Sequence, residues 1–365
     1  MKKAVAAKGG RASAPLFIFL AACAADARAD GWRPYAAMES FGHSEPVSIH
    51  DYINDWEGPL QSGSDAVTHN WLETGARKGA WSIGYVQRYD YEIKASRDAA
   101  VLYHQVKNKQ DLVPGTVYDL DLRAFHNRSQ GLRLAREFRH GNWRLEPGFS
   151  LLSGQALIDG AIHGVASAVD VKEYSFNAAV SYHYTEDALF DRQVDGPSGE
   201  GFALDLALGY RFSERWNLEL SGRDLLGFLY WREAPVTDAV ATSDTQEFDE
   251  DGYLQFRPTL TGREFNRDYH QRLHPRGLAS LQWQAREATR LDLKLRMTEV
   301  RQYASLAAAQ QLAPGLMLDL EWMPGLDALG LGLRWADFRA QLMSDSLRFE
   351  DAQVLQLQLG WAYRF

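Results

Sequence analysis

Cysteine is almost absent from this chain of 365 residues, which contains one, Cys23. A chain with a single cysteine cannot form an internal disulfide, so its stability must come from hydrogen bonding and packing. Long hydrophobic runs are also missing: after residue 30 the longest unbroken apolar run is 225–231. A membrane-spanning helix needs about 20 such residues. With a mean hydropathy of -0.37, the chain is not a helical membrane protein.

Basic residues and catalytic motifs are scarce as well. Lys and Arg total 39 against 48 Asp and Glu, a net charge of -9, which argues against nucleic acid as a partner because phosphate binding needs a basic surface. No P-loop, dinucleotide fingerprint or Gly-x-Ser-x-Gly occurs. His270 and His274 have zinc-protease spacing but lack the intervening Glu, and Pro275 follows. The sequence therefore predicts a protein that is not an enzyme, with no cofactor and no metal site.

The first thirty residues indicate export. A basic start is followed by an apolar stretch at 14–25 and by the small-x-small sequence Ala27-Arg28-Ala29, so residues 1–29 are predicted to be a cleaved signal peptide. The alternative is that 20–23 is a lipobox, in which Cys23 is lipidated and becomes the first residue. Both alternatives take the protein out of the cytoplasm.

Beyond the signal, apolar and polar residues alternate with a period of two, the pattern of strands rather than helices. Along 355–365 one face is apolar or aromatic and the other is polar or small, and 202–212, 174–184 and 291–297 repeat the pattern. These runs are longer than ordinary strands, aromatic residues gather at their ends, and short connections alternate with long ones. A soluble β-sandwich would also alternate, but these three features favour strands that cross a membrane.

The predicted fold is therefore all-β: a transmembrane antiparallel up-and-down β-barrel of about sixteen strands, within a range of 14 to 18. The barrel occupies 69–365, and 30–68 precedes it as an N-terminal extension or plug, or as one extra strand near 32–41. Arg223 and Asp224 break the alternation and suggest a bulge. The predicted strands lie near 69–78, 80–93, 98–107, 115–126, 130–139, 142–152, 170–184, 201–212, 215–231, 276–286, 290–299, 303–312, 315–323, 328–335, 338–344 and 353–365.

The final strand ends Trp361-Ala362-Tyr363-Arg364-Phe365. Together with the export signal and the alternating strands, it resembles bacterial outer-membrane β-barrel proteins of the porin-like superfamily. The resemblance implies a place in the outer membrane of a Gram-negative cell, among its lipids and lipopolysaccharide. It also implies that the barrel assembly machinery recognises Trp361, Tyr363 and Phe365 as an assembly signal. A homo-oligomer is a further expectation from general porins.

Function must be sought on the faces that point away from lipid. Charges of both signs there suit a hydrated lumen, because a dry interior would leave them unpaired at high cost. The first prediction is a channel for diffusion of small hydrophilic solutes. The alternative is a non-conducting barrel with a structural, adhesive or export-complex role. The candidate lumen-lining residues are Asp119, Asp121, Arg123, Asp205, Arg211, Glu219, Asp292, Lys294, Arg296, Asp319 and Glu321.

The segment 232–275 is expected to be a long polar loop. Its first half is acidic and its second half is basic. One hypothesis is that this loop folds inward and narrows the pore. The other is that it is a solvated surface loop that meets lipopolysaccharide through divalent ions.

Overall fold

The computed structural model describes residues 31–187, 194, 196–248 and 254–362. Their strands are β1 (Arg33–Ser44), β2 (Ala66–Lys78), β3 (Trp81–Ala95), β4 (Val117–Arg136), β5 (Phe138–His140), β6 (Trp143–Asp170), β7 (Glu173–Tyr184), β8 (Gly199–Arg211), β9 (Trp216–Phe248), β10 (Leu254–Arg272), β11 (Arg276–Arg286), β12 (Thr289–Met297), β13 (Gln302–Ala313), β14 (Leu316–Met323), β15 (Ala328–Trp335), β16 (Phe338–Ser344) and β17 (Val354–Trp361). The helices are α2 (Ile49–Ile53), α3 (Arg97–Lys107), η1 (Pro324–Leu326) and η2 (Phe349–Asp351). None of these helices is long and apolar enough to cross a membrane.

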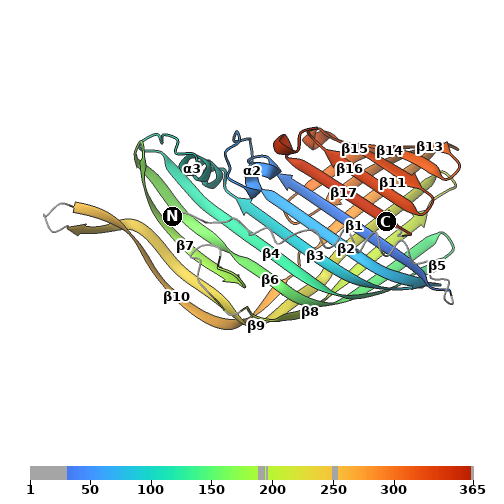
Figure 1. Cartoon of the computed structure of the whole chain (residues 1–365), viewed down its shortest axis with the longest axis horizontal. Helices are drawn as coiled ribbons and strands as arrows, with labels where there is room; N and C mark the ends of the chain where they lie inside the picture. The colour runs from blue at the N-terminus through green and yellow to red at the C-terminus, as the bar shows by residue number, and fades with distance from the viewer. Residues whose placement is uncertain (1–30, 188–193, 195, 249–253, 363–365) are drawn as a thin grey trace.

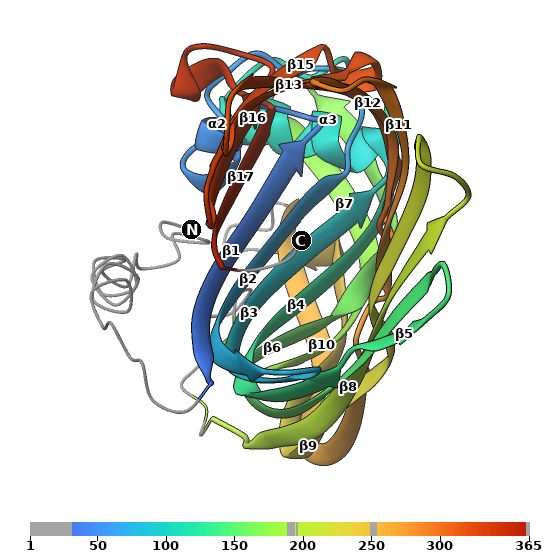
Figure 2. The same cartoon turned by 90° about the vertical axis from the view of Figure 1, so that its right-hand side faces the viewer.

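The strands form one antiparallel sheet that closes on itself, because β1 pairs with both β2 and β17 (Figures 1 and 2). Two long strands change neighbours along their length. β6 pairs first with β8 and then with β7, and β9 pairs first with β8 and β11 and then with β7 and β10. The closed ring therefore has 14 strands, formed by β1–β4, β6, β8, β9 and β11–β17. This confirms the predicted barrel and lies within its predicted range of strand number.

The outside of the ring is apolar. On β15, Leu329, Leu331 and Leu333 are exposed by 68%, 57% and 39%, and the residues between them face inward, where Arg334 contacts Asp319. A continuous row of exposed leucine side chains would be unfavourable in water, but it suits the hydrocarbon of a bilayer. Similar exposed apolar residues lie on β3, β4, β6, β8, β12, β13, β14 and β16.

One end of the barrel carries the short turns and a band of exposed aromatic rings. We call it the turn end, and the opposite end the loop end. The band lies next to the turns at 78–81, 211–216 and 335–338, where an interfacial girdle belongs. The closed ring, its apolar outside and this band are together those of a transmembrane β-barrel. The rings of the band are Trp81, Phe138, Trp143, Phe212, Trp216, Trp283, Trp335 and Phe338.

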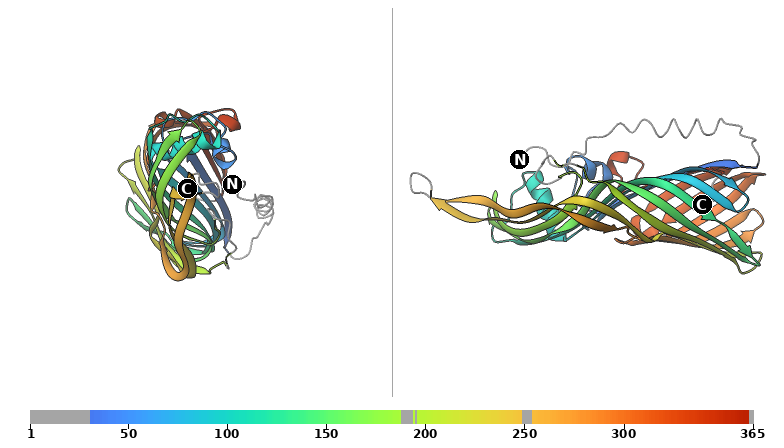
Figure 3. Two further views of the ribbon diagram at one scale, coloured as in Figure 1. Left: turned by 90° about the vertical axis from the view of Figure 1, so that its left-hand side faces the viewer. Right: turned by 90° about the horizontal axis from the view of Figure 1, so that it is seen from below.

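At the loop end the wall is uneven in height. β15 and β16 have 8 and 7 residues, whereas β6 and β9 have 28 and 33. The long strands rise past the rim together with β7, and the β9–β10 ribbon reaches farthest, as Figure 3 shows. The prediction of a long loop at 232–275 is wrong for the described part of this segment, most of which forms the paired strands β9 and β10. Cross-strand hydrogen bonds satisfy its polar backbone in that arrangement.

Two other expectations require correction, and one of the alternatives for 30–68 is selected. Residues 98–107 form α3 and not a strand: Ser96 caps the helix by accepting a hydrogen bond from the Ala99 amide at 3.2 Å, and Leu102 packs on Tyr118. The two strands expected in 115–139 are mainly one, β4. In the segment expected to be an extension or plug, β1 is instead a wall strand, as one of the alternatives proposed.

The predicted bulge is confirmed. Leu204 pairs with Leu226 and Leu206 with Gly222, so three residues of β9 face one of β8. Asp224 has a left-handed φ of 56°, and the bulge allows Arg223 and Asp224 both to point inward. The predicted signal peptide, together with Tyr363 and Phe365 of the assembly signal, lies outside the described residues; Trp361 ends β17.

Candidate functional site: a divided barrel interior

Two cavities in the described part of the barrel interior form the candidate site. The inner cavity, toward the turn end, has a volume of about 360 Å³ and is lined by residues of β1, β2, β8, β9 and β11–β17, among others. The outer cavity, toward the loop end, has a volume of about 1050 Å³ and is lined mainly by β3, β4, β6, β7, β9 and β10. We consider these two spaces and the layer between them as the candidate site.

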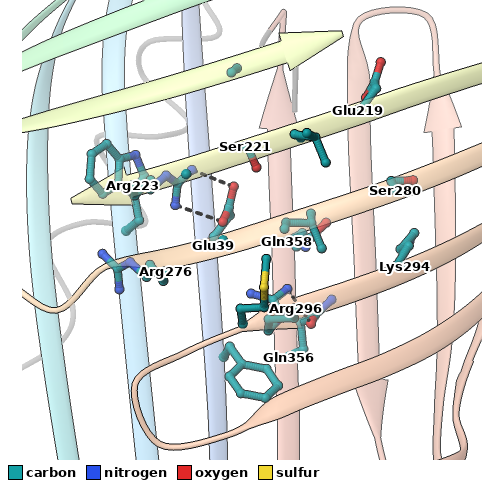
Figure 4. A pocket seen from close by; sticks show the side chains of 18 of the residues that line it. Glu39, Glu219, Ser221, Arg223, Arg276, Ser280, Lys294, Arg296, Gln356 and Gln358 are labelled. Atoms are coloured by element: carbon teal, nitrogen blue, oxygen red, sulfur yellow. Dashed lines mark hydrogen bonds and ion pairs between the residues drawn. The ribbon is translucent and has the colours of Figure 1, made fainter. Parts of the chain in front are cut away.

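The wall of the inner cavity is densely charged, and most charges are paired across neighbouring strands. Figure 4 shows side chains from β1, β9, β11, β12 and β17 converging on this space. Lys294 contacts Glu321 at 2.5 Å and Arg334 contacts Asp319 at 2.5 Å. Glu321 also accepts hydrogen bonds from Ser305 and Gln341. Such pairing satisfies charges that would be costly in an apolar interior.

The connection between β10 and β11 points side chains into the interior. This inward segment comprises residues 271–276. Gln271 donates a hydrogen bond to the backbone oxygen of His126 at 2.9 Å, and His274 contacts a carboxylate oxygen of Glu92 at 2.7 Å. His274 also stacks on Phe125, with ring centroids 3.9 Å apart. These partners lie on β3 and β4, which are not neighbours of β10 or β11 in the wall, so the side chains of the segment reach across the lumen.

A charged layer lies at the level of the inward segment. It comprises Glu39, Arg88, Asp90, Arg223, Asp224 and Arg276. Arg223 makes two hydrogen bonds to Glu39, at 2.8 and 3.0 Å. Arg88 binds Asp224 and Arg276 binds Asp90, and Arg276 lies 3.5 Å from Asp224. The layer joins β1, β3, β9 and β11 across the lumen and contains equal numbers of positive and negative groups.

Hydrogen bonding in the charged layer is incomplete. Among the described residues, Nε and Nη1 of Arg88, Nε and Nη2 of Arg276 and one oxygen of Asp224 are buried without a hydrogen-bond partner. Buried groups left in this state cost stability and often mark a functional position. Stability alone therefore does not explain the charged layer.

An apolar cluster fills the space beside the charged layer. Trp231 and Leu273 are at most 1% exposed and pack in a cluster with Trp71. The Trp231 indole fits because two neighbours are glycines: a Cβ on Gly154 would lie 2.5 Å from its ring. Trp71 also faces the charged layer, with the Arg223 guanidinium 4.3 Å from its ring centroid. Charged layer and apolar cluster together separate the two cavities.

The outer cavity combines rings with charges. His183 stacks on Tyr269 with centroids 3.7 Å apart, and the Phe125–His274 pair contributes a second stack. Lys94, Arg123 and Arg263 also line this space.

The structure places the eleven candidate lumen residues in three groups. Asp205, Glu219, Asp292, Lys294, Arg296, Asp319 and Glu321 line the inner cavity. Arg123 lines the outer cavity, and Asp119 and Asp121 lie farther along the same face of β4, exposed. Arg211 lies exposed at the turn end of β8 and lines neither cavity.

Sequence reasoning missed the charged layer. Alternation along 81–93 already placed Arg88, Asp90 and Glu92 on the polar face, so the signal for these three was present. Nothing in the sequence pattern shows that Arg276 and His274 reach them from the other side of the barrel. The inward fold of 232–275 was one hypothesis, and the described structure brings only the end of this region across the lumen.

No family model matches the chain, and no curated protein matches it. Among solved structures, the TodX deltaS2S3 mutant monoaromatic hydrocarbon channel is similar at 8% identity, with a TM-score of 0.44 over 92% of this chain and 91% of that one. The Pseudomonas putida toluene transporter TodX has 8% identity and a TM-score of 0.38, over 91% and 88%. A Pseudomonas aeruginosa FadL homologue has 10% identity and a TM-score of 0.27, over 92% and 91%. Likenesses this low carry no inference about what this chain transports.

Proposed function

We propose that this protein is an outer-membrane channel for small hydrophilic solutes, and that the inward segment closes its path in the arrangement described above. The observation that carries the proposal is the order of spaces along the barrel: a polar outer cavity, one layer of paired charges, and a polar inner cavity. A barrel with a purely structural role has no need of two charged cavities that are separated by one layer of side chains.

The inward segment has the features of a gate. Its contacts with the opposite wall are few, made chiefly by Gln271, His274 and Arg276. Its backbone stays beside β9: Gln271 and Arg272 pair with Leu229 and Phe228, the Leu273 amide donates to the Gly227 oxygen at 3.0 Å, and Arg276 pairs with Arg223. The side chains of Gln271, His274 and Arg276 can therefore swing away from β3 and β4 while the 14-stranded ring keeps its hydrogen bonds.

Apolar solutes are the competing candidate. The ring stacks of the outer cavity and the apolar cluster around Trp231 favour it. The inner cavity opposes it, because an apolar solute would have to displace or cross paired charges and would gain no contacts from them. A third alternative, a non-conducting barrel, is favoured by the same apolar cluster, since it blocks the lumen.

Conductance of the purified, folded protein in a planar bilayer tests the proposal. We expect discrete openings separated by long closed periods, and swelling of protein-containing liposomes in small sugars. Entry of an apolar tracer without sugar uptake would favour the competing candidate. The protein would be a non-conducting barrel if neither assay gave a signal. This outcome requires protein with the heat-modifiable mobility of a folded barrel, and a variant in which the contacts of the inward segment with β3 and β4 have been removed must be silent as well.

A further inference from the structure

The inner cavity carries more positive than negative groups, although the whole chain is acidic. Nine lysine and arginine residues line it, against seven aspartate and glutamate residues, while the chain has a net charge of -9. A cavity with low-dielectric walls focuses the field of its own charges, so the sign at the lining matters more to a permeating ion than the distant surface.

Arg296 is the clearest positive group without a counter-charge. It donates a hydrogen bond to Gln356 at 3.0 Å, and its guanidinium lies 4.8 Å from the ring centroid of Phe41. No carboxylate lies within ion-pair distance of it among the described residues. Lys294, on the same face of β12, differs because it is paired with Glu321. Figure 4 shows Arg296 and Lys294 beside one another on the lining.

The outer cavity also contains basic side chains that lack an ion pair among the described residues. Lys94, Arg123 and Arg263 line it, and none of the three has an ion-pair partner within the described part of the chain. Four carboxylates line the same cavity. Glu92 contacts His274 at 2.7 Å, whereas Asp238 and Asp159 accept hydrogen bonds from the neutral hydroxyl groups of Ser181 and Tyr269 and keep their charge. Glu299 is the fourth.

From these observations we infer that the channel selects anions. This inference rests on the proposed function and names the class of solute: small oxyanions that carry a carboxylate or a phosphate group. Arg296 binds the anion in the inner cavity, where positive groups are in excess, and Lys94, Arg123 and Arg263 contact it in the outer cavity. A guanidinium suits this task because its planar fork of donors matches the oxygens of these groups.

Selectivity is measured as the reversal potential in a planar bilayer under a potassium chloride gradient. We expect chloride to be more permeant than potassium, and inorganic phosphate or acetate to carry current when it replaces chloride. R296Q keeps a partner for Gln356 but removes the charge, so the chloride-to-potassium permeability ratio should fall by about twofold or more. R296K keeps the charge and should retain the selectivity.

R348Q is the matched control. Arg348 lies on the surface at the loop end, with its side chain 73% exposed, so its loss should leave the reversal potential unchanged. Heat-modifiable mobility checks that each variant is folded. Open channels with a cation-selective or zero reversal potential would overturn the inference and leave the proposed function intact. Absence of conductance would count against the proposed function itself.

Discussion

At the scale of single residues, Asp224 combines an unusual backbone conformation with two buried ion-pair partners. It sits at a bulge with a φ of 56°, is 2% exposed, and neutralises parts of both Arg88 and Arg276. A left-handed backbone is tolerated by aspartate and asparagine better than by most residues. The backbone at this position therefore allows Asp or Asn, and the two buried guanidinium groups select Asp.

D224N should lower the free energy of unfolding by about 3–5 kcal/mol, because it leaves buried positive charge uncompensated while keeping the shape and backbone preference of the side chain. Urea titration of the barrel in detergent micelles measures this. D319N is the matched control: its partner Arg334 has a side chain 27% exposed, so solvent can screen the charge left behind. Equal losses in the two variants would contradict the special role of Asp224.

At the scale of elements, the inward segment and the helix α3 differ in how far local sequence determines them. α3 has a local start signal, Ser96 followed by Asp98, although 98–107 was expected to be a strand. The inward segment has Pro275, which cannot donate a hydrogen bond to a neighbouring strand. Proline explains why the strand is interrupted at this point, while contacts with β3 and β4 decide that the interruption turns inward.

H274A should increase the open time of the channel, because it removes the Phe125 stack and the contact with Glu92 that anchor the inward segment. Single-channel recordings of the variant and the unaltered protein measure the change, which should be several-fold in open probability if the two contacts together contribute about 1–2 kcal/mol. The control is H163A: His163 lines the same outer cavity and also contacts a carboxylate, Asp121 at 3.1 Å, but this partner lies on β4 and the pair does not anchor the segment. Identical gating in H274A and the unaltered protein would show that the segment is not the gate.

At the scale of the whole molecule, the apolar outer belt fixes how the barrel sits in the bilayer. Leu331, in the middle of β15, is 57% exposed and lies between two other exposed leucines. L331R should cost about 2–4 kcal/mol of folding free energy in lipid, measured by urea titration of the barrel in vesicles. L347R is the control: Leu347 lies in the connection before η2 at the loop end, fully exposed, and its replacement should be neutral. A neutral effect of L331R would show that this part of β15 does not face the hydrocarbon of the bilayer.

The sequence by itself determined the barrel, its membrane-facing residues and the bulge at Arg223 and Asp224. Successive residues of a strand face the lipid and the lumen in turn, so each position shows in the sequence which side it faces. Only the tertiary structure decided the ring of 14 strands, since β6 and β9 each serve two sets of neighbours and no local pattern records a change of partner. Closure of the ring also brought Asp90 and Glu92 of β3 against Arg276 and His274. These residues are far apart in the chain, so their meeting depends on the curvature of the whole sheet.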